Sequence, residues 1–265
     1  MPDPFSAALT VLESGEAPYS CYNPTGQSGL VLVCDHARNT IPRQLGTLGL
    51  PPTVLATHIA LDIGCEALAI ALADRFDSVL VIAGFSRLVV DLNRPPGHPA
   101  SIPQISDGIE IPGNQDLSER ERLGRIEEIF SPYHKAVSTE VGRACDRHPQ
   151  VALVSMHSFT PRMDGQNRPW HIGILWNHDQ RLSQPLLESL RRDSGLCVGD
   201  NQPYDARAQL GYTVDTFAHI NSLAQVMIEV RQDLLESEEG VLRWAGLLSE
   251  HLKGALANWG VLIDR

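Results

Sequence analysis

The sequence has few basic residues for its length. Its 265 residues include 21 Lys and Arg against 32 Asp and Glu, so the formal net charge is −11. Binding of DNA or RNA requires clustered basic residues that neutralise phosphates, so we expect no nucleic-acid partner. We also expect no membrane span, because no apolar run approaches the roughly 18 residues that a transmembrane helix needs. The apolar content of 43% is that of a folded globular protein rather than a disordered one.

Several local signatures are also missing. No CxxC occurs among the five widely spaced cysteines, which excludes a zinc ribbon and a disulfide scaffold. No basic segment followed by an apolar stretch opens the chain, so we expect no secretory signal, reduced thiols and a cytoplasmic location. GxGxxG, GxxxxGK[ST] and GxSxG are absent, so neither nucleotide binding nor a serine nucleophile at Ser158 has motif support.

Short apolar runs alternate with longer helical patterns along the whole chain, which is typical of α/β proteins. We therefore predict one α/β domain over residues 1–265, with a largely parallel mixed sheet flanked by helices. A Pro- and Gly-rich loop is expected at 95–116, and Pro132 should kink or divide the helix around it. The predicted strands are 30–34, 78–83, 86–93, 151–156, 172–176 and 224–230, and the predicted helices are 54–75, 118–146, 179–194 and 238–258.

Polar side chains gather at or near the ends of four predicted strands. They are His36, Asn93 with Arg94, His157 with Ser158, and Glu229, which lies inside the last strand. Ligands of open α/β sheets bind beyond the carboxyl ends of the strands, so we expect these side chains to converge.

Two histidines and a carboxylate are typical ligands of a catalytic zinc ion, which keeps a fourth position for water. Such a metal lowers the pKa of its water from about 15.7 to about 7. A glutamate can then move protons, and an arginine can hold an anion or polarise a carbonyl.

Other interpretations of the same residues remain open. A single histidine at a strand end is more often a hydrogen-bonding loop residue than a ligand. A buried Glu229 is costly unless paired, and Arg231 or Arg207 could form that ion pair. His58 and Asp62 are four residues apart on the predicted helix and would share one of its faces. Either residue could be a metal ligand, or the two could simply contact each other near the end of the helix. Cys34, within an apolar run, is expected in the core.

Six motifs in order give the sequence a family resemblance. They are His36 followed by Ile41-Pro42, Asp62, the Ser-Arg-x-x-x-Asp-x-Asn-Arg segment at 86–94, His157-Ser158, Asn-x-Pro-Tyr at 201–204, and Ile228-Glu229. Together they resemble the N-formylglutamate amidohydrolase family, whose fold is similar to that of zinc carboxypeptidases and aspartoacylases. The resemblance extends from about residue 30 to about residue 235.

This resemblance implies a zinc-dependent amidohydrolase that acts on a small, anionic N-acylated amino acid such as an N-formyl acidic amino acid. By analogy, one zinc ion is bound by His36, Asp62 and His157, while Glu229 and Arg94 are catalytic. The residues expected to contact the substrate are Asn93, Arg87, Arg38, Ser158, Arg207 and Tyr212. The four arginines in these two groups would form a positively charged cleft that concentrates a small anion, although the protein as a whole is acidic. They are Arg38, Arg87, Arg94 and Arg207.

Two segments depart from the family pattern. Asp-His-Ala-Arg at 35–38 stands in place of Pro-His-Ser-Gly, and 205–209 lacks the usual Gly-Gly turn. Both segments should line the pocket, so the sequence does not identify the acyl group or the amino acid of the substrate. It does not identify the oligomeric state either. Two alternatives therefore remain. One is a non-catalytic protein in which Arg87 and Arg94 clamp a carboxylate, and the other is a deacylase or peptidase of the same fold.

Overall fold

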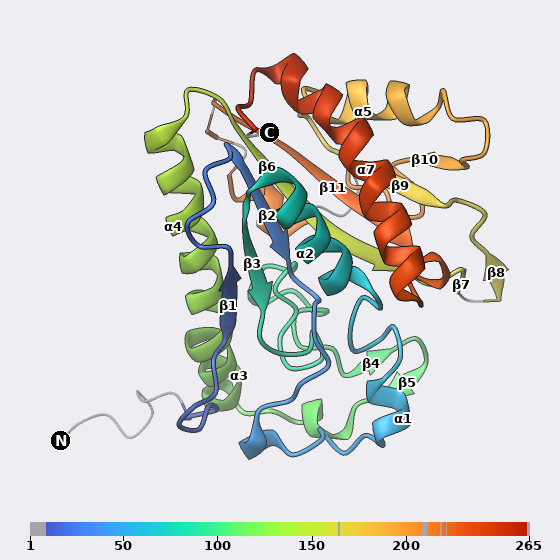
Figure 1. Ribbon diagram of the computed structural model, residues 1–265. Helices are drawn as coiled ribbons and strands as arrows, with labels where there is room; N and C mark the ends of the chain where they lie inside the picture. Colours follow the sequence, from blue (N-terminus) through green and yellow to red (C-terminus); the bar gives the residue numbers. More distant parts are fainter. Residues whose placement is uncertain (1–8, 164, 208–210, 218, 221, 264–265) are drawn as a thin grey trace.

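A computed structural model describes residues 9–163, 165–207, 211–217, 219–220 and 222–263. These residues form a seven-stranded mixed sheet in the order β1-β3-β2-β6-β11-β9-β10 (Figure 1). Strands β3, β2, β6 and β11 are parallel, whereas β1 and β9 run antiparallel to their neighbours β3 and β11. The strands are β1 Tyr19–Tyr22, β2 Leu30–Cys34, β3 Val79–Ala83, β6 Val151–Phe159, β9 Ile172–Leu175, β10 Val198–Asp200 and β11 Leu223–Arg231.

Helices flank this sheet, which confirms the predicted fold class. Helix α7 packs against both α2 and α5, whereas α4 contacts β1, β2, β3 and β6 (Figure 1). The helices are α1 Pro52–Leu55, α2 Cys65–Phe76, α3 Glu119–Arg125, α4 Ser131–Arg147, α5 Ser183–Leu190, α6 Tyr212–Asp215 and α7 Glu238–Trp259. Within the described part of the chain, no helix has the length and apolarity to cross a membrane.

Smaller elements connect the layers. Two hairpins, β4 Ile105–Ser106 with β5 Ile109–Glu110 and β7 Arg162–Met163 with β8 Gln166–Asn167, project from the connections. Short 3-10 turns are Arg43–Leu45, Pro112–Asn114 and Gln232–Leu234. A capping box of Ser118 and Glu121 begins α3. One π turn, Ile126–Phe130, separates α3 from α4 just before Pro132, which confirms that the long helix is divided there.

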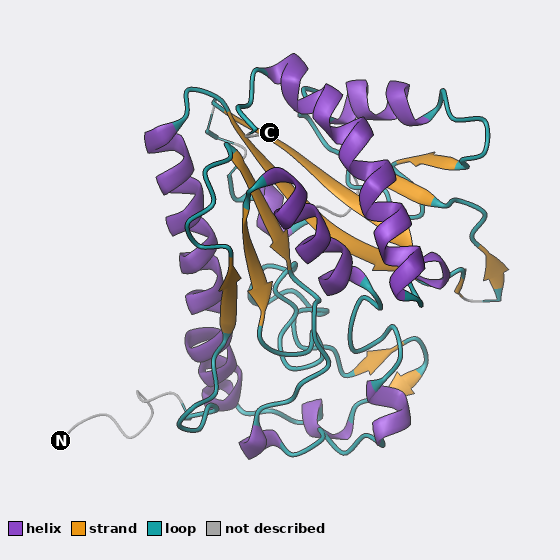
Figure 2. Cartoon of the chain, viewed as in Figure 1, coloured by secondary structure: helices purple, strands orange, loops and turns teal. Residues whose placement is uncertain are grey.

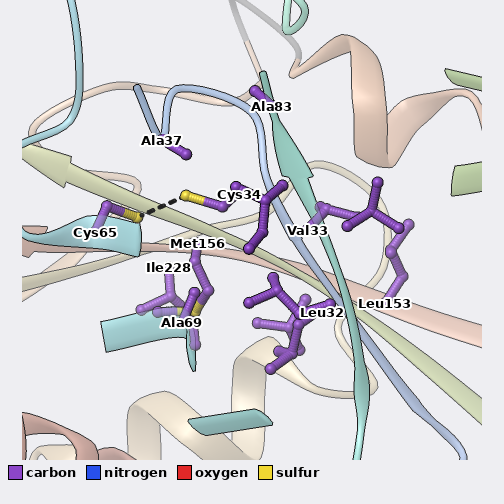
Figure 3. Packing of buried hydrophobic residues seen from close by; sticks show 14 of the residues in the cluster. Leu32, Val33, Cys34, Ala37, Cys65, Ala69, Ala83, Leu153, Met156 and Ile228 are labelled. Carbon is purple, nitrogen blue, oxygen red and sulfur yellow. Dashed lines mark hydrogen bonds between the residues drawn. The ribbon is translucent and has the colours of Figure 1, made fainter. Parts of the chain in front are cut away.

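The central strands are buried on both faces, as their continuous apolar sequences require. Every residue of β2 and β3 is buried. Cys34, at the end of β2, is fully buried, with its Sγ 3.4 Å from the Sγ of Cys65 at the start of α2 (Figure 3). Cys34 is therefore a core residue, as predicted, and all five cysteines are free thiols.

The predicted strand at 86–93 is wrong. The structure has turns there, within a long stretch of loops and short elements between β3 and α3 (Figure 2). Side chains replace the missing sheet hydrogen bonds. The Ser86 hydroxyl accepts the Leu88 N–H at 3.2 Å, and the Asp91 carboxylate accepts the Asn93 N–H at 2.9 Å. Such local bonds to Ser and Asp offer the backbone an alternative to a strand.

The predicted helix at 54–75 is also wrong over its middle. Residues 56–64 are irregular, and α2 begins only at Cys65, after Gly64 with φ 76°. A positive φ is favourable for glycine but breaks a helix. His58 and Asp62 therefore do not share a helical face. Strand β6, by contrast, is longer than predicted, so His157 and Ser158 lie inside it rather than after its end.

A buried arginine anchors the irregular segment at 86–94. Arg125 of α3 is 1% exposed, and its guanidinium donates to the carbonyl of Val89 at 2.9 Å. It also donates to the carbonyl of Gly113 at 3.0 Å and to Oδ1 of Asn114 at 2.7 Å. Burial lowers the pKa of Arg125 to about 10, so the charge itself is costly and the three hydrogen bonds offset that cost.

We expect Arg125→Ala to lower the free energy of unfolding by about 3 kcal/mol, because it leaves three buried acceptors without a donor. Arg125→Lys should recover only part of the loss, since an ammonium group cannot reproduce the planar fork. Chemical denaturation of both variants checks this, and an Arg125→Ala protein as stable as the wild type would contradict it.

Candidate active site

The candidate site lies at the point where the chain order of the sheet reverses. Strand β2 has β3 on one side and β6 on the other, and such switch points form crevices at the carboxyl ends of strands. His36 follows β2 directly, and His157 lies near the end of β6. Glu229 of β11 is paired with His157 in register, so the two side chains lie next to each other on the same face of the sheet.

Three buried side chains form the centre of the site. His36, Asp62 and His157 each offer a ligand atom, and these atoms lie within 4.8 Å of one another. Oδ2 of Asp62 is 2.8 Å from Nδ1 of His157 and 3.4 Å from Nδ1 of His36. The irregular segment before α2 brings Asp62 there, and its backbone N–H donates to the carbonyl of His36 at 2.9 Å.

The other nitrogen of each imidazole is held by a second polar group. Nε2 of His36 is 2.8 Å from Oδ1 of Asp91. Nε2 of His157 is 3.0 Å from the Ser155 hydroxyl and 3.5 Å from Oδ2 of Asp35. Bonds of this kind fix the tautomer and the ring orientation of metal-binding histidines. Both Nδ1 atoms are therefore directed to one point beside Asp62.

Arg87 connects two of the carboxylates. Its guanidinium is 2.9 Å from Oδ2 of Asp91 and 3.5 Å from Oδ1 of Asp62. Burial by itself would raise the pKa of Asp91, but Arg87 and then His36 hold that pKa well below its usual range. Burial likewise opposes the ionisation of Asp62, and the two histidines lower its pKa. Both carboxyl groups are therefore ionised near neutral pH.

The buried charges of the site do not balance without a cation. Asp35, Asp62 and Asp91 all have lowered pKa values. Among the described residues, the one guanidinium within ion-pair distance of any of them is that of Arg87, which contacts Asp62 and Asp91, so the buried ion pairs leave an excess of negative charge. Burial alone would lower the pKa values of His36 and His157, but the neighbouring carboxylates raise both. Protonation of both imidazoles, or one divalent cation, can neutralise this excess negative charge. The donor set of two imidazoles and a carboxylate fits zinc, whose binding displaces such protons.

The carboxyl group of Glu229 is buried, and it forms no ion pair with any described residue. It is 6% exposed, and its Oε2 atom is buried with no hydrogen-bond partner among the described residues. Burial raises its pKa to about 7, with His157 acting in the opposite direction. A carboxyl group that titrates near neutral pH can both accept and return a proton.

The ion pairs considered for Glu229 from the sequence are not formed. Nε of Arg231 is 2.7 Å from Oδ1 of Asp233, and Nε of Arg207 is 2.9 Å from Oδ1 of Asp205. That interpretation was wrong because both arginines find a carboxylate two residues away on their own segment.

A cavity of about 300 Å³ opens over this cluster. Its lining includes the three central residues with Glu229, and also Arg87, Asn93, Arg94 and Ser158. Arg94 donates to the carbonyl of Asn93 at 3.1 Å, and no carboxylate of the described residues lies within ion-pair distance of it. Oδ1 of Asn93 accepts the Thr213 N–H at 3.2 Å, so its amide nitrogen is left to donate elsewhere. The Ser158 hydroxyl donates to the carbonyl of Ile63 at 2.8 Å.

Three residues expected at the substrate do not line this cavity. Arg38 binds Glu66, with 2.8 Å between Nη2 and Oε1. Arg207 lies over the ring of Trp176, 6.0 Å from its centroid, and Tyr212 packs on Phe130 and His134. Of the departing segment at 205–209, residues 208 and 209 lie outside the described residues.

Sequence reasoning gave no role to several groups that the fold brings to the site. Asp35 accepts hydrogen bonds from the hydroxyls of Tyr133 at 2.6 Å and Thr213 at 3.1 Å, and Asp91 orients His36. Of these two, only Asp91 had a signal, because it lies inside the 86–94 motif. His58, which the sequence offered as a ligand or a simple contact, reaches the cavity wall from the irregular segment, with Nε2 3.1 Å from Oδ2 of Asp107 in the β4–β5 turn.

Known proteins share both the sequence pattern and the fold. The model of the N-formylglutamate amidohydrolase family matches residues 28–236. A crystal structure of a gene product from Agrobacterium tumefaciens is 38% identical, with a TM-score of 0.90 over 93% of this chain and 98% of that chain. The structure of an N-formylglutamate amidohydrolase from Ralstonia eutropha JMP134 shares the fold, at 22% identity and a TM-score of 0.61 over 92% and 97% of the two chains. A comparison with curated proteins found no match. The family match covers most of the chain, which therefore belongs to the N-formylglutamate amidohydrolase family and is a hydrolase that acts on an amide.

Proposed function

We propose that this protein is a zinc-dependent amidohydrolase that cleaves the amide bond of a small N-acylated acidic amino acid. The observation that carries the proposal is the buried group of His36, Asp62 and His157 beside Glu229, whose Oε2 has no hydrogen-bond partner among the described residues. Membership of the amidohydrolase family supports the reaction type. Arg94, which has no carboxylate partner among the described residues and lines the same cavity, supports an anionic substrate.

His36 and His157 would hold the ion through Nδ1, and Asp62 through a carboxylate oxygen. When bound, zinc supplies a Lewis acid and lowers the pKa of a water molecule to near neutrality. Asp91 and Ser155, on the opposite nitrogens, keep both rings in position. The carboxylates of Asp35, Asp62 and Asp91 would offset the charge of a divalent ion.

Glu229 would act as the general base and then as the general acid. Its carboxylate takes a proton from the attacking water and returns it to the leaving amine, and a pKa near neutrality suits both transfers. Arg94 would donate to the carbonyl oxygen of the scissile amide as charge develops on it. The amide nitrogen of Asn93, together with the positive potential of Arg87 and Arg94, would hold the substrate carboxylate.

Protein purified without chelators is expected to contain about one zinc ion per chain, since three protein ligands suffice for a catalytic site. His157→Ala should lose the metal, because one of two imidazole ligands is gone. The exposed His98 serves as a matched control, and His98→Ala should keep the metal. Elemental analysis by mass spectrometry measures both variants, and full activity in metal-free wild-type protein would refute the zinc assignment.

Glu229→Gln should reduce kcat by about 10²- to 10⁴-fold, which is the usual contribution of a general base, while zinc content stays unchanged. The wild-type rate should fall as pH drops through the pKa of Glu229, because the protonated carboxyl cannot accept a proton. The variant should lack this acidic limb. A non-catalytic carboxylate-binding protein would show no turnover in either form, so steady-state kinetics against pH separates the two functions.

A panel of N-formyl and N-acetyl amino acids is expected to show faster hydrolysis of acidic than of neutral members. The guanidinium of Arg94, which has no carboxylate within ion-pair distance among the described residues, favours a second carboxylate in the cavity. Values of kcat/KM for glutamate and glutamine derivatives compare substrates of nearly equal shape. Equal values for the two would exclude the acidic preference and favour a deacylase or peptidase of other specificity.

A further inference from the structure

A second and larger cavity adjoins the catalytic cavity. The second cavity has a volume of about 650 Å³ and lies beyond the carboxyl end of β9. Both cavities are lined by Leu175, Ala206, Gly211 and Met227, so these four residues form the boundary between them. The larger cavity therefore adjoins the reacting centre, although it contains none of the proposed metal ligands.

The second cavity has both apolar and polar lining residues. Trp176, Val214 and Met227 supply apolar lining. Asp215 at the end of α6 and Gln225 of β11 line the same space, and each has a buried side-chain oxygen with no hydrogen-bond partner among the described residues. Unpaired buried acceptors are costly, so a ligand that donates hydrogen bonds would be stabilised here.

The net charge of this lining is negative. Asp179 and Arg181 neutralise each other, with 2.7 Å between Oδ2 and Nη2. Asp215 forms no such pair within the described part of the chain, although the exposed His178 lowers its pKa. Burial raises that pKa to about 6, so the carboxylate is still ionised at neutral pH. One uncompensated carboxylate thus faces the larger cavity.

We propose that the second cavity binds a distal, positively charged part of the substrate, so that the preferred substrate is an N-acyl amino acid extended through an amide-linked unit that carries an ammonium or guanidinium group. This inference rests on the proposed function of the adjoining site. The charges are complementary to such a molecule, with Arg94 near the reacting end and Asp215 at the far end. The catalytic cavity alone is at the lower limit of the ~300–1,000 Å³ that small-molecule sites occupy, so a longer ligand needs the added space.

The test compares N-formylglutamate joined to lysine with N-formylglutamate joined to norleucine, which has the same chain length without the ammonium group. Both α- and γ-linked forms are assayed on zinc-loaded enzyme, beside N-formylglutamate itself. We expect the better lysine compound to exceed its norleucine partner in kcat/KM about tenfold, the contribution of one charge-assisted hydrogen bond. Asp215→Asn should reduce this ratio to near one, whereas Asp193→Asn, an exposed carboxylate outside both cavities, should keep it.

A second measurement is independent of turnover. Calorimetric binding of the same pairs to Glu229→Gln should show the same preference for lysine and the same loss of preference when Asp215→Asn is added. Equal kcat/KM and equal Kd for lysine and norleucine compounds would overturn the inference, while hydrolysis of N-formylglutamate would still uphold the proposed function. Tighter binding of the lysine compound without hydrolysis of any compound would support the cavity assignment and refute the amidohydrolase reaction.

Discussion

The carboxylate of Asp62 lies between two imidazoles, and the rest of the site is arranged around this contact. Bringing three groups from distant segments into a buried centre costs solvation, which a protein can offset only with further partners. Asp91, Ser155 and Asp35 supply those partners to the histidines, and Arg87 supplies one to the carboxylates. The remaining negative charge is what makes the centre suitable for a divalent cation.

This centre requires a rigid frame, and the sheet provides most of it. Parallel pairing of β6 with β11 sets Glu229 beside His157, and the reversal of strand order beside β2 leaves a crevice for His36. The irregular segment at 86–94 has no sheet to support it. Arg125 of α3 instead donates a buried hydrogen bond to the carbonyl of Val89, and Asn114, which it also contacts, donates to the carbonyl of Leu88.

The two cavities give the site a direction. Arg94 lines the cavity of the candidate site, and the carboxylate of Asp215 lines the adjoining one. A net-acidic protein thus has opposite local charges in two adjoining cavities, a distribution that total charge does not describe. Orientation of an asymmetric ligand would follow from this arrangement of charges.

The sequence by itself determined the fold class, the buried strands and the residue types of the site, because strand and helix periodicities and strand-end polar residues are local signals. It also placed Glu229 in a buried strand and marked Asp62. Tertiary structure alone decided that residues 86–93 turn rather than extend, since the oxygens of Ser86 and Asp91 replace sheet partners. It also decided that Arg38 pairs with Glu66, and that Asp35 lies near His157. These outcomes depend on which distant segments come into contact and which buried charges must be paired. Local sequence patterns do not predict such contacts.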